Sequence, residues 1–240
     1  MPVTKSPLRY PGGKSQLFKF IENIFVINNF DNIIYCEPFS GGFGVGLELL
    51  HSNMVNSLII NDYDIGIYSI WYAILNDSDK FCRLINDTQI NIQEWNKQKI
   101  IYENNKNNNY YSLELAFSTF FLNRTNISGI ISGGPIGGKH QDKKYLLDCR
   151  FNKKKLLEKI DFINSNRNRI ELYNLEANEL INKIIKSIPP SEIFLFFDPP
   201  YYNQGKNLYL NFFKHNDHVN LSKNIKKLEE YSWILTYDNS

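Results

Sequence analysis

The sequence predicts an α/β fold built on a parallel sheet, and three observations point to it. Residues 193–197, IFLFF, form an apolar run without alternation, which is typical of a strand buried on both faces of a parallel sheet. Residues 33–52 combine a strand, a glycine-rich turn and a helix, which is how a nucleotide-binding βαβ unit opens. Polar residues dominate between about Asn76 and Asn166, and we expect this segment to be an insertion.

Composition limits the class of protein. The chain has 240 residues, is 42% hydrophobic and carries a formal net charge of +2, which suits a sizeable core but does not by itself indicate nucleic-acid binding. No apolar run approaches the length of a membrane span, and the first residues lack the apolar core of a signal peptide. Three scattered cysteines favour reduced thiols in a cytoplasmic protein, and no His or Cys spacing suits a metal site.

The first element is a predicted helix from Ser15 to about Ile27, opened by a turn at residues 11–13, PGG. Lys14 at this turn could reach an anion, and Tyr10 could cover a ring. A solvated lysine and a packed tyrosine are the alternative interpretation.

The next elements are a strand, Ile33–Glu37, and a glycine-rich turn, residues 38–46, before a helix that continues to Ser52. Gly41 and Gly42 let the backbone approach a ligand, and the helix N-terminus favours negative charge. The turn lacks the G-x-G-x-x-G fingerprint, which disfavours a nicotinamide cofactor. Glu37 ends the strand, either facing a positively charged ligand group or lying as a carboxylate on the surface.

A second strand, beginning at Ser57, ends in Asn61-Asp62. An acidic residue about twenty positions beyond the glycine turn is typical of a carboxylate that binds ribose hydroxyls. The alternative is an N-cap, formed by Asp62 or Asp64, for the helix expected through Ile74. Both roles are compatible if one aspartate binds and the other caps.

The insertion is expected to contain a solvated loop at Asn104–Asn109, a helix at Leu113–Leu122 and a glycine-rich stretch that ends in basic residues. Its basic side chains are Lys143, Lys144, Arg150, Lys153, Lys154 and Lys155. Such a cluster is typical of a surface that follows phosphates, although a basic run is often only a solvated face.

The last part of the chain predicts two further strands and two helices around residues 193–197. The strands are Ile170–Leu175, which leads to Glu176, and Trp233–Tyr237, and the helices are Ala177–Lys186 and about Asp217–Tyr231.

The strand at residues 193–197 must stop at Asp198, because Pro199 and Pro200 cannot continue its hydrogen-bond ladder. The Asp198 carboxylate and the Pro199 carbonyl would accept hydrogen bonds from both N–H groups of an exocyclic amine such as that of adenine. Tyr201 offers a face on which a base could stack. Alternatively, the two prolines only mark a turn and the tyrosines pack at its rim.

Taken together, these stretches resemble the Dam-type family of DNA adenine-N6 methyltransferases. The matching pieces, in order, are RYPGGK (9–14), EPFSGGFGVG (37–46), NDYD (61–64), FFLNRTNISG (120–129), DPPYY (198–202), Asp217-His218 and ILTYDN (234–239). The resemblance implies a doubly wound Rossmann-like methyltransferase sheet, formed by residues 1–76 and 166–240. It further implies an inserted, mostly helical DNA-recognition subdomain at residues 77–165.

The same resemblance implies an S-adenosylmethionine-dependent enzyme that methylates N6 of an adenine flipped out of duplex DNA. The matching positions for target adenine are Asp198, Pro199, Pro200 and Tyr201. Those for the methyl donor are Tyr10, Lys14, Glu37, Pro38, Phe39, Ser40, Gly41, Gly42, Asp62, Glu176 and Asp198. Those for DNA are Arg124, Thr125, Asn126, Ser128, Lys139, Lys143 and Lys144.

The implied partner is double-stranded DNA, with a cognate restriction endonuclease if the protein belongs to a restriction-modification system, and the expected state is a monomer or weak dimer. Three departures from the family are visible: Phe43 where a glycine is common, Glu176 where an aspartate is usual, and no further strand pair after residues 234–239. The last departure predicts a sheet without its final hairpin. The alternatives are an RNA or protein-amide methyltransferase and a catalytically inactive DNA-binding relative.

Overall fold

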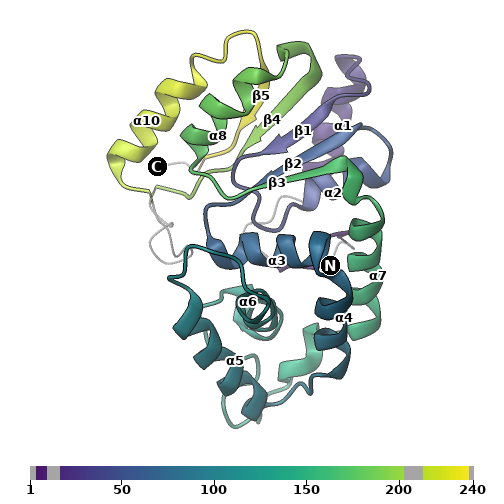
Figure 1. Ribbon diagram of the computed structural model, residues 1–240, viewed down its shortest axis with the longest axis vertical. Helices are drawn as coiled ribbons and strands as arrows, with labels where there is room; N and C mark the ends of the chain where they lie inside the picture. Colours follow the sequence, from purple (N-terminus) through teal and green to yellow (C-terminus); the bar gives the residue numbers. More distant parts are fainter. Residues whose placement is uncertain (1–3, 10–16, 203–212, 238–240) are drawn as a thin grey trace. The chain divides into compact units, whose positions relative to one another are not determined.

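The computed structural model describes residues 4–9, 17–202 and 213–237, and these form two compact units. The sheet unit contains residues 17–64, 169–202 and 213–237, and the helical unit contains residues 4–9 and 65–168. Figure 1 traces both units along the chain. Each unit has its own hydrophobic interior and is described by itself.

The sheet unit is built on five parallel strands in the order β3-β2-β1-β4-β5. The strands are β1 (Ile34–Glu37), β2 (Ser57–Asn61), β3 (Ile170–Tyr173), β4 (Ile193–Phe197) and β5 (Ser232–Leu235). The chain moves outward from β1 to β2 and β3, and then continues on the other side of β1 with β4 and β5. This reversal creates a topological switch point between β1 and β4, where doubly wound sheets bind ligands. The predicted α/β fold is confirmed.

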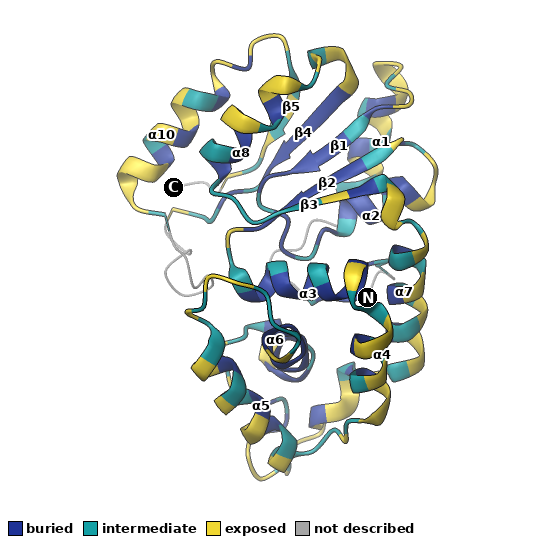
Figure 2. Ribbon diagram, in the orientation of Figure 1, coloured by how far each residue is buried: buried dark blue, intermediate teal, exposed yellow. Residues whose placement is uncertain are grey.

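Strand register brings the carboxyl ends of β1 and β4 together at the switch point. Ile34 pairs with Ile193, and Cys36 pairs with Leu195. All five residues of β4 are buried, as its unbroken apolar run predicts. Figure 2 shows the same burial along the inner strands of the sheet.

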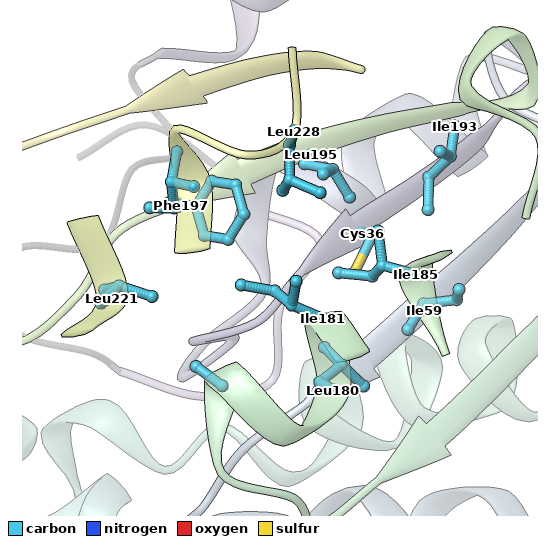
Figure 3. Packing of buried hydrophobic residues seen from close by; sticks show 12 residues of the cluster. Cys36, Ile59, Leu180, Ile181, Ile185, Ile193, Leu195, Phe197, Leu221 and Leu228 are labelled. Carbon is cyan, nitrogen blue, oxygen red and sulfur yellow. The ribbon is translucent and has the colours of Figure 1, made fainter. Parts of the chain in front are cut away.

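Helices cover both faces of the sheet. On one face, α8 (Ala177–Lys183) and α10 (His215–Ile225) pack on a cluster that includes Leu195 and Phe197. Figure 3 shows this cluster, with Ile181 and Leu221 facing the strands. On the other face lies α1 (Phe18–Ile27), and the centroid of its Phe25 ring is 5.0 Å from the centroid of the Phe194 ring.

The helix after the glycine turn, α2 (Gly44–His51), begins earlier than the sequence predicts. Phe43 precedes it in the left-handed conformation, at φ 48°, so the turn ends there and Gly44 already has helical geometry. Phe43 is 1% exposed, and its ring lies directly over Gly46. Gly46 is therefore required as a glycine, because a Cβ there would lie 2.4 Å from the Phe43 ring. The side chain that departs from the family pattern is thus part of the core.

The helical unit contains α3 (Ile65–Asn76), α4 (Ser78–Asp87), α5 (Ile92–Asn105), α6 (Leu113–Thr125) and α7 (Lys153–Ser165). Short 3₁₀ turns lie at Ile127–Gly129 and Leu147–Arg150 in this unit and at Arg167–Arg169, Ile185–Ser187 and Pro190–Glu192 elsewhere. Figure 1 shows α6 end-on, and it packs against both α3 and α5. Its side chains are buried on all sides, as expected for a central helix.

Two boundaries in the helical unit differ from the prediction. The solvated loop expected at Asn104–Asn109 begins later, because α5 continues through Asn105. The helix expected to end at Leu122 continues to Thr125, whose hydroxyl donates to the Phe121 carbonyl at 2.7 Å. Arg124 therefore belongs to the last turn of a buried helix and not to a loop.

The described part of the chain contains neither a membrane-spanning helix nor a metal-binding group of side chains. No helix there is long and apolar enough to cross a membrane. Nor do its His, Cys, Asp and Glu side chains form a group of three that could hold a metal ion.

Candidate active site and nucleic-acid interface

The carboxylate after β4 is held by the end of β5. The Thr236 hydroxyl donates to Asp198 Oδ1 at 2.6 Å, and the Thr236 N–H donates to the Phe197 carbonyl at 2.9 Å. These two bonds fix both the backbone that carries Asp198 and the orientation of its carboxyl group. Pro199 is buried, whereas Pro200 and Tyr201 are partly exposed. The segment therefore presents oxygen acceptors and an aromatic ring at the switch point.

The glycine turn is tied to the end of β2 by Asp62. The Gly41 N–H donates to Asp62 Oδ2 at 2.9 Å, and the Asp64 N–H donates to Oδ1 at 2.9 Å. Gly41 has φ 45°, in the left-handed region that suits glycine. Asp62 thus shapes the turn directly, in addition to its predicted ligand role.

Burial, with the neighbouring charge of Asp64 as a second cause, raises the pKa of Asp62 to about 7, and hydrogen bonds from the Asp64 and Gly41 N–H groups partly oppose this shift. A carboxyl group that titrates near neutral pH at the end of a strand is typical of a binding site.

Asn61 joins three strand ends, a role that the sequence did not predict. Its Nδ2 donates to the Pro38 carbonyl at 2.8 Å and to the Leu175 carbonyl at 3.0 Å, and its Oδ1 accepts from the Leu175 N–H at 3.0 Å. The side chain is fully buried. Its place at the end of a buried strand could have predicted this role, because a buried polar side chain needs hydrogen-bond partners.

Three further residues of the predicted methyl-donor site make contacts within the sheet unit. Glu37 is 6% exposed, and the Tyr35 hydroxyl donates to its Oε1 at 2.9 Å. Burial and the nearby Glu37 charge raise the pKa of Tyr35 well above its usual value, so Tyr35 stays a proton donor. Glu176 is the N-cap of α8 and accepts from the Asn178 N–H at 2.9 Å. Phe39, next to the predicted turn residue Ser40, packs edge-on against Phe213 at 5.6 Å.

In the helical unit, Asn126 holds the loop that follows α6. Its Nδ2 donates to the carbonyls of Ile130 and Ile131 at 2.9 Å each, and of Gly133 at 3.2 Å. Its Oδ1 accepts from Trp95 Nε1 at 2.7 Å. Asn126 is fully buried, as is Thr125, and the Asn126 side chain supports the loop from inside.

The N-terminal segment is locked onto the same loop. The Arg9 N–H donates to Asn123 Oδ1 at 2.8 Å, and Asn123 Nδ2 donates to the carbonyls of Arg9 at 2.6 Å and Gly129 at 3.1 Å. Gly129 has φ 79°, and a Cβ there would lie 2.3 Å from the Arg9 carbonyl oxygen. The loop and segment 4–9 can approach this closely only because position 129 is glycine.

Arg124 is largely buried, and its guanidinium group donates to backbone carbonyls. Nη1 donates to the Pro7 carbonyl at 3.3 Å, and Nη2 donates to the Arg150 carbonyl. Burial, followed by the charges of Arg9 and Arg150, lowers the pKa of Arg124 to about 9. The predicted DNA residue thus lies inside a group of arginines.

The exposed part of the helical unit carries the remaining predicted DNA residues. Ser128 is exposed at φ 58°, beside Ile127, which is 54% exposed. Lys139, Lys143 and Lys144 are also exposed. The Lys144 ammonium group lies 5.8 Å from the centre of the Tyr145 ring, and that ring is 59% exposed. Exposed cations and aromatic rings are the side chains that contact nucleic acid.

The predicted donor residues Tyr10 and Lys14 lie outside the described residues. Among the other predicted residues, the structure brings the glycine turn and Asp62 together in the sheet unit. In the helical unit it places Arg124, Thr125 and Asn126 at the start of the loop that follows α6. Sequence reasoning missed Thr236, Asn61, Asn123 and Trp95. Thr236 and Asn123 lie inside motifs that match the family, and this could have predicted their importance. No feature of the sequence around Trp95 predicts its contact with Asn126.

Comparison with known proteins adds one match. The model of the family described as D12 class N6 adenine-specific DNA methyltransferase matches residues 10–240 of the chain. A search of curated proteins finds no match.

Proposed function

The chain belongs to the D12 class of N6 adenine-specific DNA methyltransferases, and from this premise we propose that it transfers a methyl group from S-adenosylmethionine to an adenine flipped out of duplex DNA. The bound donor supplies an electrophilic methyl group on a sulfonium. The chain's own residues hold the two substrates in line and make the amine a better nucleophile.

The side chains at the predicted methyl-donor site of the sheet unit suit S-adenosylmethionine. Asp62 offers a carboxylate to ribose hydroxyls, and its hydrogen bond from Gly41 keeps the turn in the left-handed conformation that allows close approach of a ligand. Glu37, at the end of β1, offers a negative charge to the cationic end of the donor. We propose that Tyr10, Lys14 and Glu176 complete this site.

The observation that carries the proposal is the anchoring of Asp198 at the switch point. An exocyclic amine is a weak nucleophile because its lone pair is delocalised into the ring. The Asp198 carboxylate and the Pro199 carbonyl would accept hydrogen bonds from the two N–H groups of the amine. These bonds would localise the lone pair on the nitrogen. Tyr201 would stack on the extruded base, which has lost its neighbours in the duplex.

The helical unit is the proposed DNA interface. Asn126 supports the loop from inside, and Ile127, Ser128 and the exposed lysines are groups available to DNA. An exposed apolar side chain such as Ile127 can fill the space that an extruded base leaves. The family's DNA substrate favours this proposal over an RNA or protein-amide substrate.

The decisive experiment compares the wild type with Asp198→Ala, using labelled S-adenosylmethionine and unmethylated duplex DNA. We expect label in adenine with the wild type only, and similar donor affinity for both proteins. If the wild type binds S-adenosylmethionine but incorporates no label into the DNA, duplex DNA is rejected as the substrate. Simultaneous loss of methylation and donor binding in Asp198→Ala would reject the role given to this carboxylate.

A further inference from the structure

We propose that Arg9, Arg124 and Arg150 form a binding site for a phosphate of the DNA backbone, on the helical unit. The proposal rests on the proposed function, because DNA supplies the phosphate. It adds Arg9 to the interface, selects Arg150 from the basic cluster of the insertion, and gives Arg124 a supporting position within the site.

The three arginines are adjacent although they are far apart in the sequence. Arg9 Nη1 donates to the carbonyls of Asn126 at 2.7 Å and Arg124 at 3.3 Å. Arg124 Nη2 in turn donates to the carbonyl of Arg150. Arg9 and Arg124 therefore each contact the backbone of the next arginine, and segment 4–9, the end of α6 and the turn at Leu147–Arg150 meet at one point.

This arrangement concentrates positive charge. Within residues 4–9, 17–202 and 213–237, no carboxylate forms an ion pair with any of the three arginines. In the same part of the chain, Arg124 Nε is buried without a hydrogen-bond partner. The charge of Arg150 lowers the pKa of Arg9, after the larger effect of burial. Repulsion between these groups is the physical cost of the arrangement.

A bound phosphate would remove this cost. Guanidinium groups match phosphate oxygens with paired, charge-assisted hydrogen bonds, and they tolerate close packing better than ammonium groups because they are weakly hydrated. The carbonyl bonds of Arg9 and Arg124 hold those side chains in place before any ligand arrives. The partly exposed Arg150 is then the member that can reach the phosphate.

The test is the salt dependence of duplex DNA binding by Arg150→Gln, Arg150→Lys and the wild type. Arg83→Gln is the matched control, since Arg83 is an exposed arginine on α4 of the same unit whose Nε donates to the Asp79 carbonyl of its own helix. A lost phosphate contact reduces the slope of log K against log salt by roughly 0.9. Between 50 and 200 mM salt, the affinity of Arg150→Gln should therefore fall about threefold less than that of the wild type.

Arg150→Lys should keep most of the wild-type slope, because it retains the charge, and Arg83→Gln should be unchanged. A wild-type slope in Arg150→Gln overturns the proposal, as does an equal loss in Arg83→Gln. Methylation by the wild type, measured in parallel, separates the two levels: an active wild type with equal slopes rejects only the phosphate site. An inactive wild type rejects the proposed function.

Discussion

The hydroxyl of Thr236 donates to Asp198 Oδ1 across 2.6 Å, so the last strand of the sheet orients the carboxylate that follows β4. The next residue, Tyr237, contacts Nδ1 of His218 on α10, and the His218 ring lies 5.2 Å from the ring of Tyr202. Both ends of the segment 198–202 are thus connected to the end of β5. Thr236 is a positioning residue, since it acts through Asp198.

Thr236→Val should lower kcat for methylation without changing donor affinity, because it removes the hydroxyl and keeps the shape of the side chain. A hydrogen bond to a charged group contributes about 1.5–3 kcal/mol, which corresponds to a roughly 10- to 100-fold loss in kcat. Thr236→Ser keeps the hydroxyl and should restore most of kcat. Steady-state kinetics with both substrates varied checks this; equal activity of the Val and Ser variants would contradict it.

Gly129→Ala should destabilise the helical unit by at least about 1 kcal/mol, because φ is positive at this position and the new Cβ would meet the Arg9 carbonyl. Gly134→Ala is the control in the same loop, where a Cβ would have no neighbour within 4 Å. Its effect should stay within about 0.5 kcal/mol. Urea unfolding measures both changes. Similar stability of the two variants would show that segment 4–9 does not lie against position 129.

Stability should fall as pH rises through neutrality, because the folded protein raises the pKa of Asp62 from 3.8 to about 7. The folded state therefore binds this proton more tightly than the unfolded state. The resulting stabilisation is complete below about pH 4 and is lost as pH rises through about 7. Between pH 5 and pH 8 the change attributable to Asp62 should be about 2–3 kcal/mol.

Asp62→Asn isolates this effect, since the amide has a similar shape and does not ionise in this range. Denaturant unfolding of the wild type and Asp62→Asn is measured at pH 5, 6.5 and 8. The free energies of unfolding of the two proteins should converge toward pH 5, where the Asp62 carboxyl is protonated, and separate toward pH 8, where it is ionised. Parallel curves would contradict the raised pKa. In the wild type, donor affinity should increase with pH over the same range, because the ionised carboxylate accepts hydrogen bonds from both ribose hydroxyls.

Sequence alone determined that the sheet is parallel and where its buried strand ends. The unbroken apolar run of β4 requires burial on both faces, and the prolines after Asp198 require the strand to stop there. Strand, glycine turn and helix at residues 33–52 likewise follow from local chemistry. Positive φ at Gly41 agrees with this, since glycine adopts that conformation at little cost.

Tertiary structure alone decided which polar groups meet. Thr236 is 38 residues from Asp198, and Arg9 is 114 residues from Asn123. No local pattern encodes such pairs, because a side chain's partner depends on where folding brings distant segments. Arg124 illustrates the consequence, since its position in the sequence suggested a contact with DNA. Its hydrogen bonds to Pro7 and Arg150, which the sequence did not predict, place it inside the group of arginines.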